Sequence, residues 1–219
     1  MFLPDGLVRS RDARPRRSPQ TMRATSRSAP GEGRASIVEA GYELISELGY
    51  ASATTARICA RAGISSGTFF HYFPTKIDLL VGILEADATD SKLQAEALNS
   101  LAAESAEAGL QAWLEALLEE AGDPHLAGFV AALGAAGRDP RLAELLADAA
   151  SLQEKKLEAI ISAGQQQGLW RSDLAPGRLA VWVGVIADGL LSRTVEDPNF
   201  AAVQGADELR DLIDRYLAH

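Results

Sequence analysis

Residues 54–80 read TTARICARAGISSGTFFHYFPTKIDLL, and this stretch decides the fold. Two short segments with helical patterns flank the turn Ala62-Gly63-Ile64-Ser65. The glycine permits the positive φ of a tight interhelical turn, and Ile64 can fill the angle between the two helices. The stretch therefore predicts a helix-turn-helix.

The first helix of the pair is expected to begin near Thr54 and to end at Gly63. Small and apolar residues recur there with the spacing of one helix face. This inner face comprises Thr55, Ile58, Cys59 and Ala62. Cys59 is the only cysteine, so it is either a small buried residue or a redox sensor. Without a second thiol to form a disulfide, burial is the favoured interpretation.

The second helix is expected to begin near Ser65 and to end before Pro74. Phe69 and Phe73 are four residues apart and predict its buried side. The opposite side carries no carboxylate, so it can enter a major groove without repelling phosphates. The candidate DNA-binding residues on this helix are Ser66, Gly67, Thr68, Phe70, His71 and Tyr72.

These residues suit different contacts. The polar candidates for base edges are Ser66, Thr68 and His71, and Gly67 permits close backbone approach. Phe70 either contacts a thymine methyl group or only packs sideways. Tyr72 either donates its hydroxyl to a phosphate or packs half-buried.

The helix ends flanking this unit carry further phosphate-contact candidates. One of Thr54 and Thr55 is expected to cap its helix, and one hydroxyl to touch a phosphate. Lys76 lies in the first turn of a long helix capped by Thr75 and Asp78, where a cation opposes the helix dipole. A phosphate partner would explain that placement, and the alternative is an exposed lysine without a partner. Arg57 and Arg61 reach either phosphates or the surface carboxylates of Glu39, Glu43 and Glu47.

The charge is divided along the chain. The net charge is −9, but residues 1–80 hold 11 Lys and Arg against 7 Asp and Glu, whereas residues 81–219 hold 10 against 23. A locally positive segment can bind nucleic acid although the acidic remainder repels it. Residues 1–33 are rich in Arg and Pro and predict a disordered arm, which either grips phosphates or is a solvated tail.

Helical patterns continue beyond this unit. We predict an all-α fold, in which a three-helix helix-turn-helix domain at 34–80 is joined by a long helix to a helical-bundle domain for ligand binding and dimerisation at 81–219. The long helix is expected to reach about Leu98. Further helices are predicted at 107–121, 124–137, 140–167, 175–194 and 206–217.

Residues 34–82 resemble the N-terminal domain of TetR/AcrR-family transcriptional regulators. The shared features include Ala62-Gly63-Ile64-Ser65, Gly67-Thr68-Phe69-Phe70, Tyr72-Phe73 and Lys76 after Pro74-Thr75. Phe70 stands where the family usually has Tyr, and Cys59 where Ala is usual. Residues 137–191 resemble the BetI-like regulatory domain in landmarks such as Asp139-Pro140 and Asp188-Gly189-Leu190. The resemblance implies a homodimer that binds a palindromic double-stranded DNA operator and a ligand in its C-terminal body.

The helix at 175–194 is apolar nearly all round between Leu179 and Ala187, so it must be buried from two sides. The final helix supplies a second apolar stripe, and together they predict a dimer interface of two helices from each subunit. The alternative is a monomeric bundle with a central buried helix. The candidate interface residues are Trp182, Val185, Ile186, Gly189, Leu190, Leu209, Leu212, Ile213 and Tyr216.

A ligand pocket is expected inside the bundle, and the balance of aliphatic and aromatic residues favours a small hydrophobic effector. The candidate ligand-binding residues, each of which could instead be ordinary packing, are Trp113, His125, Phe129, Gln165 and Trp170. Asp188 could orient a ligand, although a structural hydrogen bond is the favoured role.

The sequence shows no catalytic motif. The histidines are His71, His125 and His219, without metal-ligand spacing, and neither a phosphate loop nor a serine nucleophile motif occurs. We therefore expect no catalytic residue, metal or cofactor. The first residues contain no apolar stretch of secretory-signal length, so a cytoplasmic location is expected. These patterns predict a ligand-responsive transcriptional repressor rather than an enzyme; the alternative is a small-molecule-binding helical protein that never touches DNA.

Overall fold

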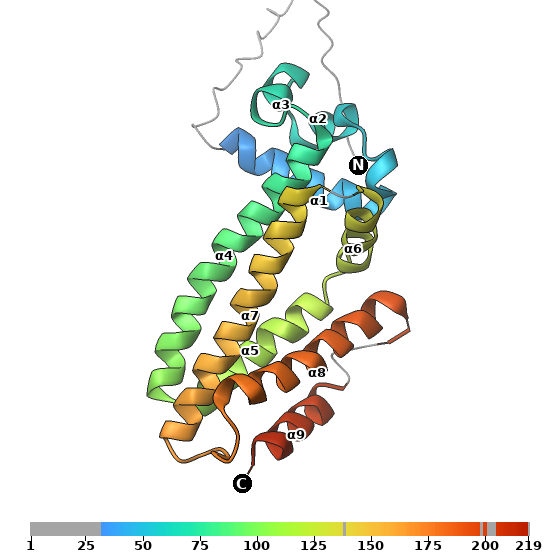
Figure 1. Ribbon diagram of the computed structural model, residues 1–219. Helices are drawn as coiled ribbons and strands as arrows, with labels where there is room; N and C mark the ends of the chain where they lie inside the picture. The colour runs from blue at the N-terminus through green and yellow to red at the C-terminus, as the bar shows by residue number, and fades with distance from the viewer. Residues whose placement is uncertain (1–31, 138, 198, 201–204, 219) are drawn as a thin grey trace, which may run out of the picture.

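The computed structural model describes residues 32–137, 139–197, 199–200 and 205–218. These residues form helices and no strand, which confirms the predicted all-α fold. Figure 1 shows the three N-terminal helices at one end of a longer helical body. The helices are α1 (Glu32–Ser52), α2 (Thr55–Ala62), α3 (Ser66–Tyr72), α4 (Lys76–Glu104), α5 (Ala106–Ala121), α6 (Leu126–Ala135), α7 (Pro140–Gln166), α8 (Pro176–Glu196) and α9 (Ala206–Leu217).

Local hydrogen bonds explain the helix-turn-helix. The Thr54 hydroxyl caps α2 by accepting from the backbone N–H of Arg57 at 3.4 Å. Helix α2 ends at Gly63, whose φ of 68° lies in the left-handed region that glycine adopts without strain. Ser65 then caps α3 by accepting from the N–H of Thr68 at 3.0 Å. The predicted helix-turn-helix is confirmed, and Thr54 rather than Thr55 is the cap.

The long helix α4 begins with the predicted capping box. The N–H of Thr75 donates to the Asp78 carboxylate at 2.9 Å, and the N–H of Asp78 donates back to the Thr75 hydroxyl at 3.3 Å. The helix continues to Glu104, beyond the expected end at Leu98, because neither Pro nor Gly occurs between Leu98 and Ser105. Helix α4 thus joins the helix-turn-helix to the body without a break.

Two hydrophobic cores divide the molecule. The lower core is built from α5, α7, α8 and α9 together with the end of α4. The upper core contains the buried residues of α1 to α3 and the start of α4, but also Phe129 and Ala132 of α6 and Leu142 of α7. The upper core therefore includes helices that the sequence analysis assigned to the body.

Helix α6 lies directly against α1 in this upper core. A Cβ atom on Gly128 would stand 2.0 Å from the carbonyl oxygen of Ser46, so only glycine allows this approach. Next to it, the rings of Tyr42 and Phe129 lie 5.0 Å apart. A movement of α6 would therefore act directly on α1.

The predicted helices of the body agree with α5 to α9 to within two residues at most ends. Asp139 caps α7 by accepting from the N–H of Arg141 at 2.9 Å, and Pro140 occupies the first turn. The arm predicted over 1–33 lies outside the described residues except at its end, where Glu32 and Gly33 already belong to α1. Within the described ranges, no helix combines the length and apolar character that crossing a bilayer requires.

Candidate nucleic-acid interface

The outer face of α3 is exposed at the end of the molecule farthest from α9 (Figure 1). Phe69 and Phe73 are buried in the upper core, as predicted. The next residue, Phe70, points outward with 51% of its surface exposed. Helix α3 is therefore anchored by two rings and presents a third to solvent. The other exposed candidates on this face are Ser66, Gly67 and His71.

The remaining two candidates on α3 are half-buried and already have neighbours. The Thr68 hydroxyl lies 2.9 Å from that of Ser65, within the N-terminal cap of the helix. Tyr72 packs edge-on against His71, with ring centres 5.0 Å apart, and lies close to Gly33 of α1. Thr68 and Tyr72 thus contribute to the rigidity of the face, and their contacts to DNA stay predictions.

Lys76 has partners within the chain, and its predicted contact with a phosphate stays a prediction. Its ammonium donates to the backbone carbonyls of Tyr50 and Ala51 at the end of α1, and it lies 4.1 Å from the centre of the Tyr50 ring. A cation is favourable there because a helix end leaves carbonyls unpaired. Burial lowers the pKa of Lys76. The alternative of a lysine without a partner is wrong, and its ammonium joins α4 to α1.

The two arginines of α2 also have partners in the protein. Arg61 forms ion pairs with Glu43 at 2.6 Å and Glu47 at 3.1 Å, and these hydrogen bonds raise the pKa of its guanidinium. Arg57 donates to the carbonyl of Ser52 at 3.2 Å. The surface-pair interpretation is therefore confirmed for Arg61. Such exposed pairs contribute little to stability.

Two polar contacts link the helix-turn-helix to the body. Arg141 of α7 pairs with Asp139 at 2.9 Å and with Asp78 of the α4 cap at 2.7 Å. The hydroxyl of Tyr42 in α1 donates to the Asp123 carboxylate at 2.5 Å, in the turn between α5 and α6. Burial, and then Asp123, raise the pKa of Tyr42. The body is thus connected to α1 and α4 by polar side-chain contacts as well as by the hydrophobic upper core.

The five predicted ligand-binding residues do not form one site. Trp113 and Trp170 are buried in the lower core, whereas Phe129 is buried in the upper core. His125 packs against the Tyr42 ring at 5.8 Å. The Gln165 amide donates to the backbone carbonyls of Arg171 and Leu174 at 2.8 and 2.9 Å. The structure does not bring these five residues together, and their role in ligand binding stays a prediction.

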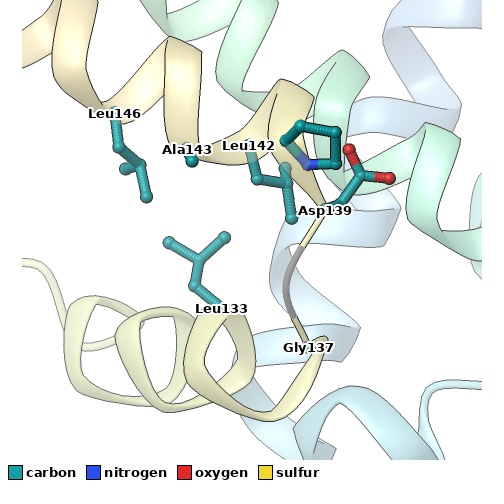
Figure 2. Close-up of a pocket in the computed structure, with 7 residues that line it drawn as sticks. Leu133, Gly137, Asp139, Leu142, Ala143 and Leu146 are labelled. Atoms are coloured by element: carbon teal, nitrogen blue, oxygen red, sulfur yellow. The ribbon is translucent and has the colours of Figure 1, made fainter.

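A surface hollow of about 400 Å³ lies instead where α6 meets α7. Figure 2 shows Leu133 of α6 facing Leu142, Ala143 and Leu146 of α7 across it, with Asp139 at one end. A second hollow, of about 420 Å³, lies between α4 and α7 and is lined partly by Gln166 and Gln167. None of the five predicted ligand-binding residues lines either hollow.

The predicted dimer residues divide into two groups. On the outer side of α8, Trp182 is 53% exposed, and on α9 Leu212 is exposed as well. Ile186, Leu190 and Tyr216 are partly buried against the lower core of their own chain. Leu209 and Ile213 are fully inside that core, so their assignment to the interface is wrong: they form the inward stripe of α9. The exposed residues that fit an interface are Val181, Trp182, Val185, Gly189 and Leu212.

Two models of known protein families match this chain, one in each part of the architecture. The family model described as "Bacterial regulatory proteins, tetR family" matches residues 37–83. The model described as "BetI-type transcriptional repressor, C-terminal" matches residues 106–219, more than half of the chain. The chain belongs to the TetR family of transcriptional regulators. This TetR-family member is therefore a regulator rather than an enzyme.

Relatives of this TetR-family chain agree with the assignment. The HTH-type transcriptional regulator BetI of Escherichia coli O17:K52:H18 (strain UMN026 / ExPEC) is 40% identical over 92 residues, which are 40% of this chain and 45% of that protein. The match thus spans less than half the length of this curated relative.

Solved structures with the same fold are more distant. A TetR transcription regulator from Haloarcula marismortui has a TM-score of 0.72 at 22% identity, over 86% of this chain and 99% of its own. A transcriptional regulator from Saccharomonospora viridis, solved in complex with choline, has a TM-score of 0.70 at 22% identity, over 87% and 100%. At this identity they show that the fold is shared.

Sequence reasoning missed the residues that connect the two parts of this TetR-family chain. Tyr42, Asp123 and Arg141 act across long stretches of sequence, so no local spacing reveals them. The sequence offered one nearby signal, the landmark Asp139-Pro140 directly before Arg141, which was interpreted only as a feature of the BetI-like resemblance.

Proposed function

We propose that this TetR-family regulator is a cytoplasmic repressor that binds a palindromic operator as a homodimer and is released by a small effector bound in its helical body. The observation that carries the proposal is the outer face of α3. It is exposed, free of carboxylates and fixed from below by Phe69 and Phe73. Such a face fits a major groove.

Different residues in and next to this face are proposed to contact different parts of the DNA. Ser66 and His71 are exposed and carry hydrogen-bonding groups for base edges, and Gly67 allows the backbone to approach. Phe70 offers an apolar surface for a thymine methyl group. Thr54 and Thr55, at the start of α2, are left for phosphate contacts. Lys76 is proposed to fix the angle between α1 and α4 rather than to carry the affinity.

The dimer is supported by the outer side of α8 together with α9. Exposed aliphatic and aromatic side chains gather there at Val181, Trp182 and Val185, with Leu212 on α9. Surfaces of this kind are typical of contacts between subunits. A two-fold dimer would place two α3 helices about 34–36 Å apart, or a multiple of that, so that both dock in successive grooves.

The test is selection of double-stranded fragments by the purified full chain, followed by fluorescence anisotropy on the enriched sequence. We expect an inverted repeat bound in the nanomolar range, with an affinity that falls steeply as salt rises. Enrichment of no sequence, and no binding at low salt, would favour the alternative of a helical small-molecule-binding protein without DNA binding. His71→Ala should change the preferred base at a single position, with a loss of about 1–3 kcal/mol on the selected sequence.

A further inference from the structure

The hollow between α6 and α7 has walls that are almost entirely apolar. Leu133 of α6 faces Ala143 and Leu146 of α7 across a space of about 400 Å³ (Figure 2), and Pro140 and Leu142 belong to the same lining. Leu146 is 44% exposed in this hollow. Apolar walls that meet water instead of each other gain free energy when an apolar molecule fills the space between them. The volume lies within the range of small-molecule sites.

The charged group in this lining is already neutralised. Asp139 is the one ionisable side chain among the described residues that line the hollow. One of its carboxylate oxygens accepts from the backbone N–H and the Nε–H of Arg141 at 2.9 and 3.1 Å, and the other accepts from Nη2 at 2.9 Å. Both oxygens thus have charge-assisted partners. The described lining offers no free charge to a ligand, so a charged ligand would lose hydration there without compensation.

Helix α6, which forms one wall, is held by a helix other than α7. It packs mainly against α1. The close approach of Gly128 to the backbone of Ser46 fixes α6 on α1, and Phe129 and Ala132 extend that contact into the upper core. The position of α6 is therefore coupled to α1, and the hollow is a gap between two helices that are held separately.

The opposite wall belongs to the first two turns of α7, which are joined to the start of α4. Asp139 caps α7, Asp78 caps α4, and Arg141 pairs with both carboxylates at 2.9 and 2.7 Å. The next residue, Leu142, lines the hollow and is also buried in the upper core. One guanidinium thus joins the N-terminal caps of two helices directly beside the hollow.

We propose that the hollow between α6 and α7 is the effector site of this chain, and that it takes a small uncharged molecule with an apolar body. The inference rests on the proposed function, in which an effector releases the operator. A molecule seated between Leu133 and Leu146 sets the separation of α6 from α7. Because α6 is fixed on α1 and α7 is joined to α4, this separation controls the angle between α1 and α4 and thereby the position of the helix-turn-helix.

Ligand-observed NMR titrations of the full chain test the ligand class with three molecules that share a hexyl chain: 1-hexanol, hexylammonium and hexanoate. We expect 1-hexanol to bind about five-fold or more tightly than either charged analogue, because the hollow has no free counter-charge for them. Equal or tighter binding of hexylammonium or hexanoate, or no binding of 1-hexanol, overturns the proposal.

Matched variants test the location. Ala143→Phe places a ring in the hollow and should weaken 1-hexanol about five-fold or more, because the space is then occupied. Ala147→Phe is the control, since Ala147 is exposed one turn further along α7 and is not part of the lining. Thermal unfolding checks that both variants fold. Leu146→Ser, which removes part of an exposed wall, should weaken 1-hexanol as well and decides the matter if Ala143→Phe does not fold. Equal effects of the two phenylalanine substitutions overturn the site.

Operator binding by anisotropy separates the two proposals. Because its ring mimics a bound effector, Ala143→Phe should lower operator affinity about five-fold without ligand, whereas Ala147→Phe should keep the wild-type affinity. An operator that is bound equally by both variants and is not released from the wild type by 1-hexanol refutes the effector site alone. A chain that binds 1-hexanol in the hollow but no DNA refutes the proposed function. Release of the operator by 1-hexanol from the wild type, absent in Ala143→Phe, supports both.

Discussion

The outer face of α3 and the outer face of α8 are both exposed, but their chemistry differs. The α3 face carries small and polar groups around one aromatic ring, Phe70, whereas the α8 face gathers Val181, Trp182 and Val185. A wet, polar partner such as DNA suits the first, and a second copy of the chain suits the other. The two faces thus share exposure but differ in composition, which is what suggests a different partner for each.

The largest effect should come from placing a charge in the α8 face. Val185→Glu would bury an unpaired carboxylate at the subunit interface and weaken dimerisation about a hundred-fold or more, with a parallel loss of operator affinity. Analytical ultracentrifugation measures the dimer. Leu93→Glu is the control, because Leu93 is 63% exposed on α4, away from α8 and α9. A Val185→Glu protein that remains dimeric would remove α8 from the interface.

Two adjacent phenylalanines of α3 allow packing and recognition to be tested separately. Phe69→Ala should lower the free energy of unfolding by about 3–5 kcal/mol, because the ring is fully buried in the upper core. Phe70→Ala should change it by less than about 0.5 kcal/mol but weaken operator binding. Urea unfolding and anisotropy measure the two effects. Equal destabilisation by both substitutions would mean that Phe70 serves packing rather than recognition.

A substitution of Lys76 distinguishes a structural role of this lysine from a phosphate-binding role. Lys76→Met removes the hydrogen bonds to the end of α1 and should lower the free energy of unfolding by about 1 kcal/mol. The dependence of operator affinity on salt should stay unchanged, because no phosphate contact is lost. Thermal unfolding and a salt titration of anisotropy test this. A flatter salt dependence with unchanged stability would restore Lys76 to the DNA backbone.

The smallest effect concerns the contact between α4 and α7. Thr75 and Arg141 lower the pKa of Asp78, so its carboxylate stabilises the folded state above the ordinary aspartate pKa of about 3.9. That contribution disappears as the pH falls through the lower folded-state value. Asp78→Asn should therefore be less stable than the wild type by about 1 kcal/mol or less at neutral pH.

Urea midpoints measured from pH 7 downward test this prediction. The difference between wild type and Asp78→Asn should begin to narrow below about pH 4 and close once the pH falls below the lowered folded-state pKa, where both side chains are uncharged. Glu96→Gln, exposed on the same helix, should show no such convergence. A difference that persists at low pH would assign the effect to helix geometry instead of charge.

Interactions between residues close in sequence were predictable from the sequence, whereas interactions between residues far apart in sequence were not. The turn at Gly63 and the cap formed by Thr75 and Asp78 depend on residues within a few positions, so spacing alone predicted them. The sequence did not reveal the partner of Lys76 within the chain, because the end of α1 lies 26 positions away. An arrangement of this kind depends on tertiary packing, which local patterns do not record.

Some candidates for the dimer interface and the ligand pocket lie elsewhere than expected, for a related reason. Helix α9 has one strong apolar stripe, and Leu209 and Ile213 in it serve the core of their own chain rather than a partner. A stripe shows that burial is required without showing against what. The ligand candidates were chosen as large or polar residues of the bundle, but Trp113 and Trp170 fill the lower core.

Hydroxyl-radical footprinting of the full chain on its selected operator tests the central claim most directly. Two α3 helices held by one dimer should protect two tracts on one side of the duplex, with centres about 34–36 Å or a multiple of that apart, and Val185→Glu should abolish both together. A single protected tract, or two tracts that survive in a monomeric variant, would contradict the account.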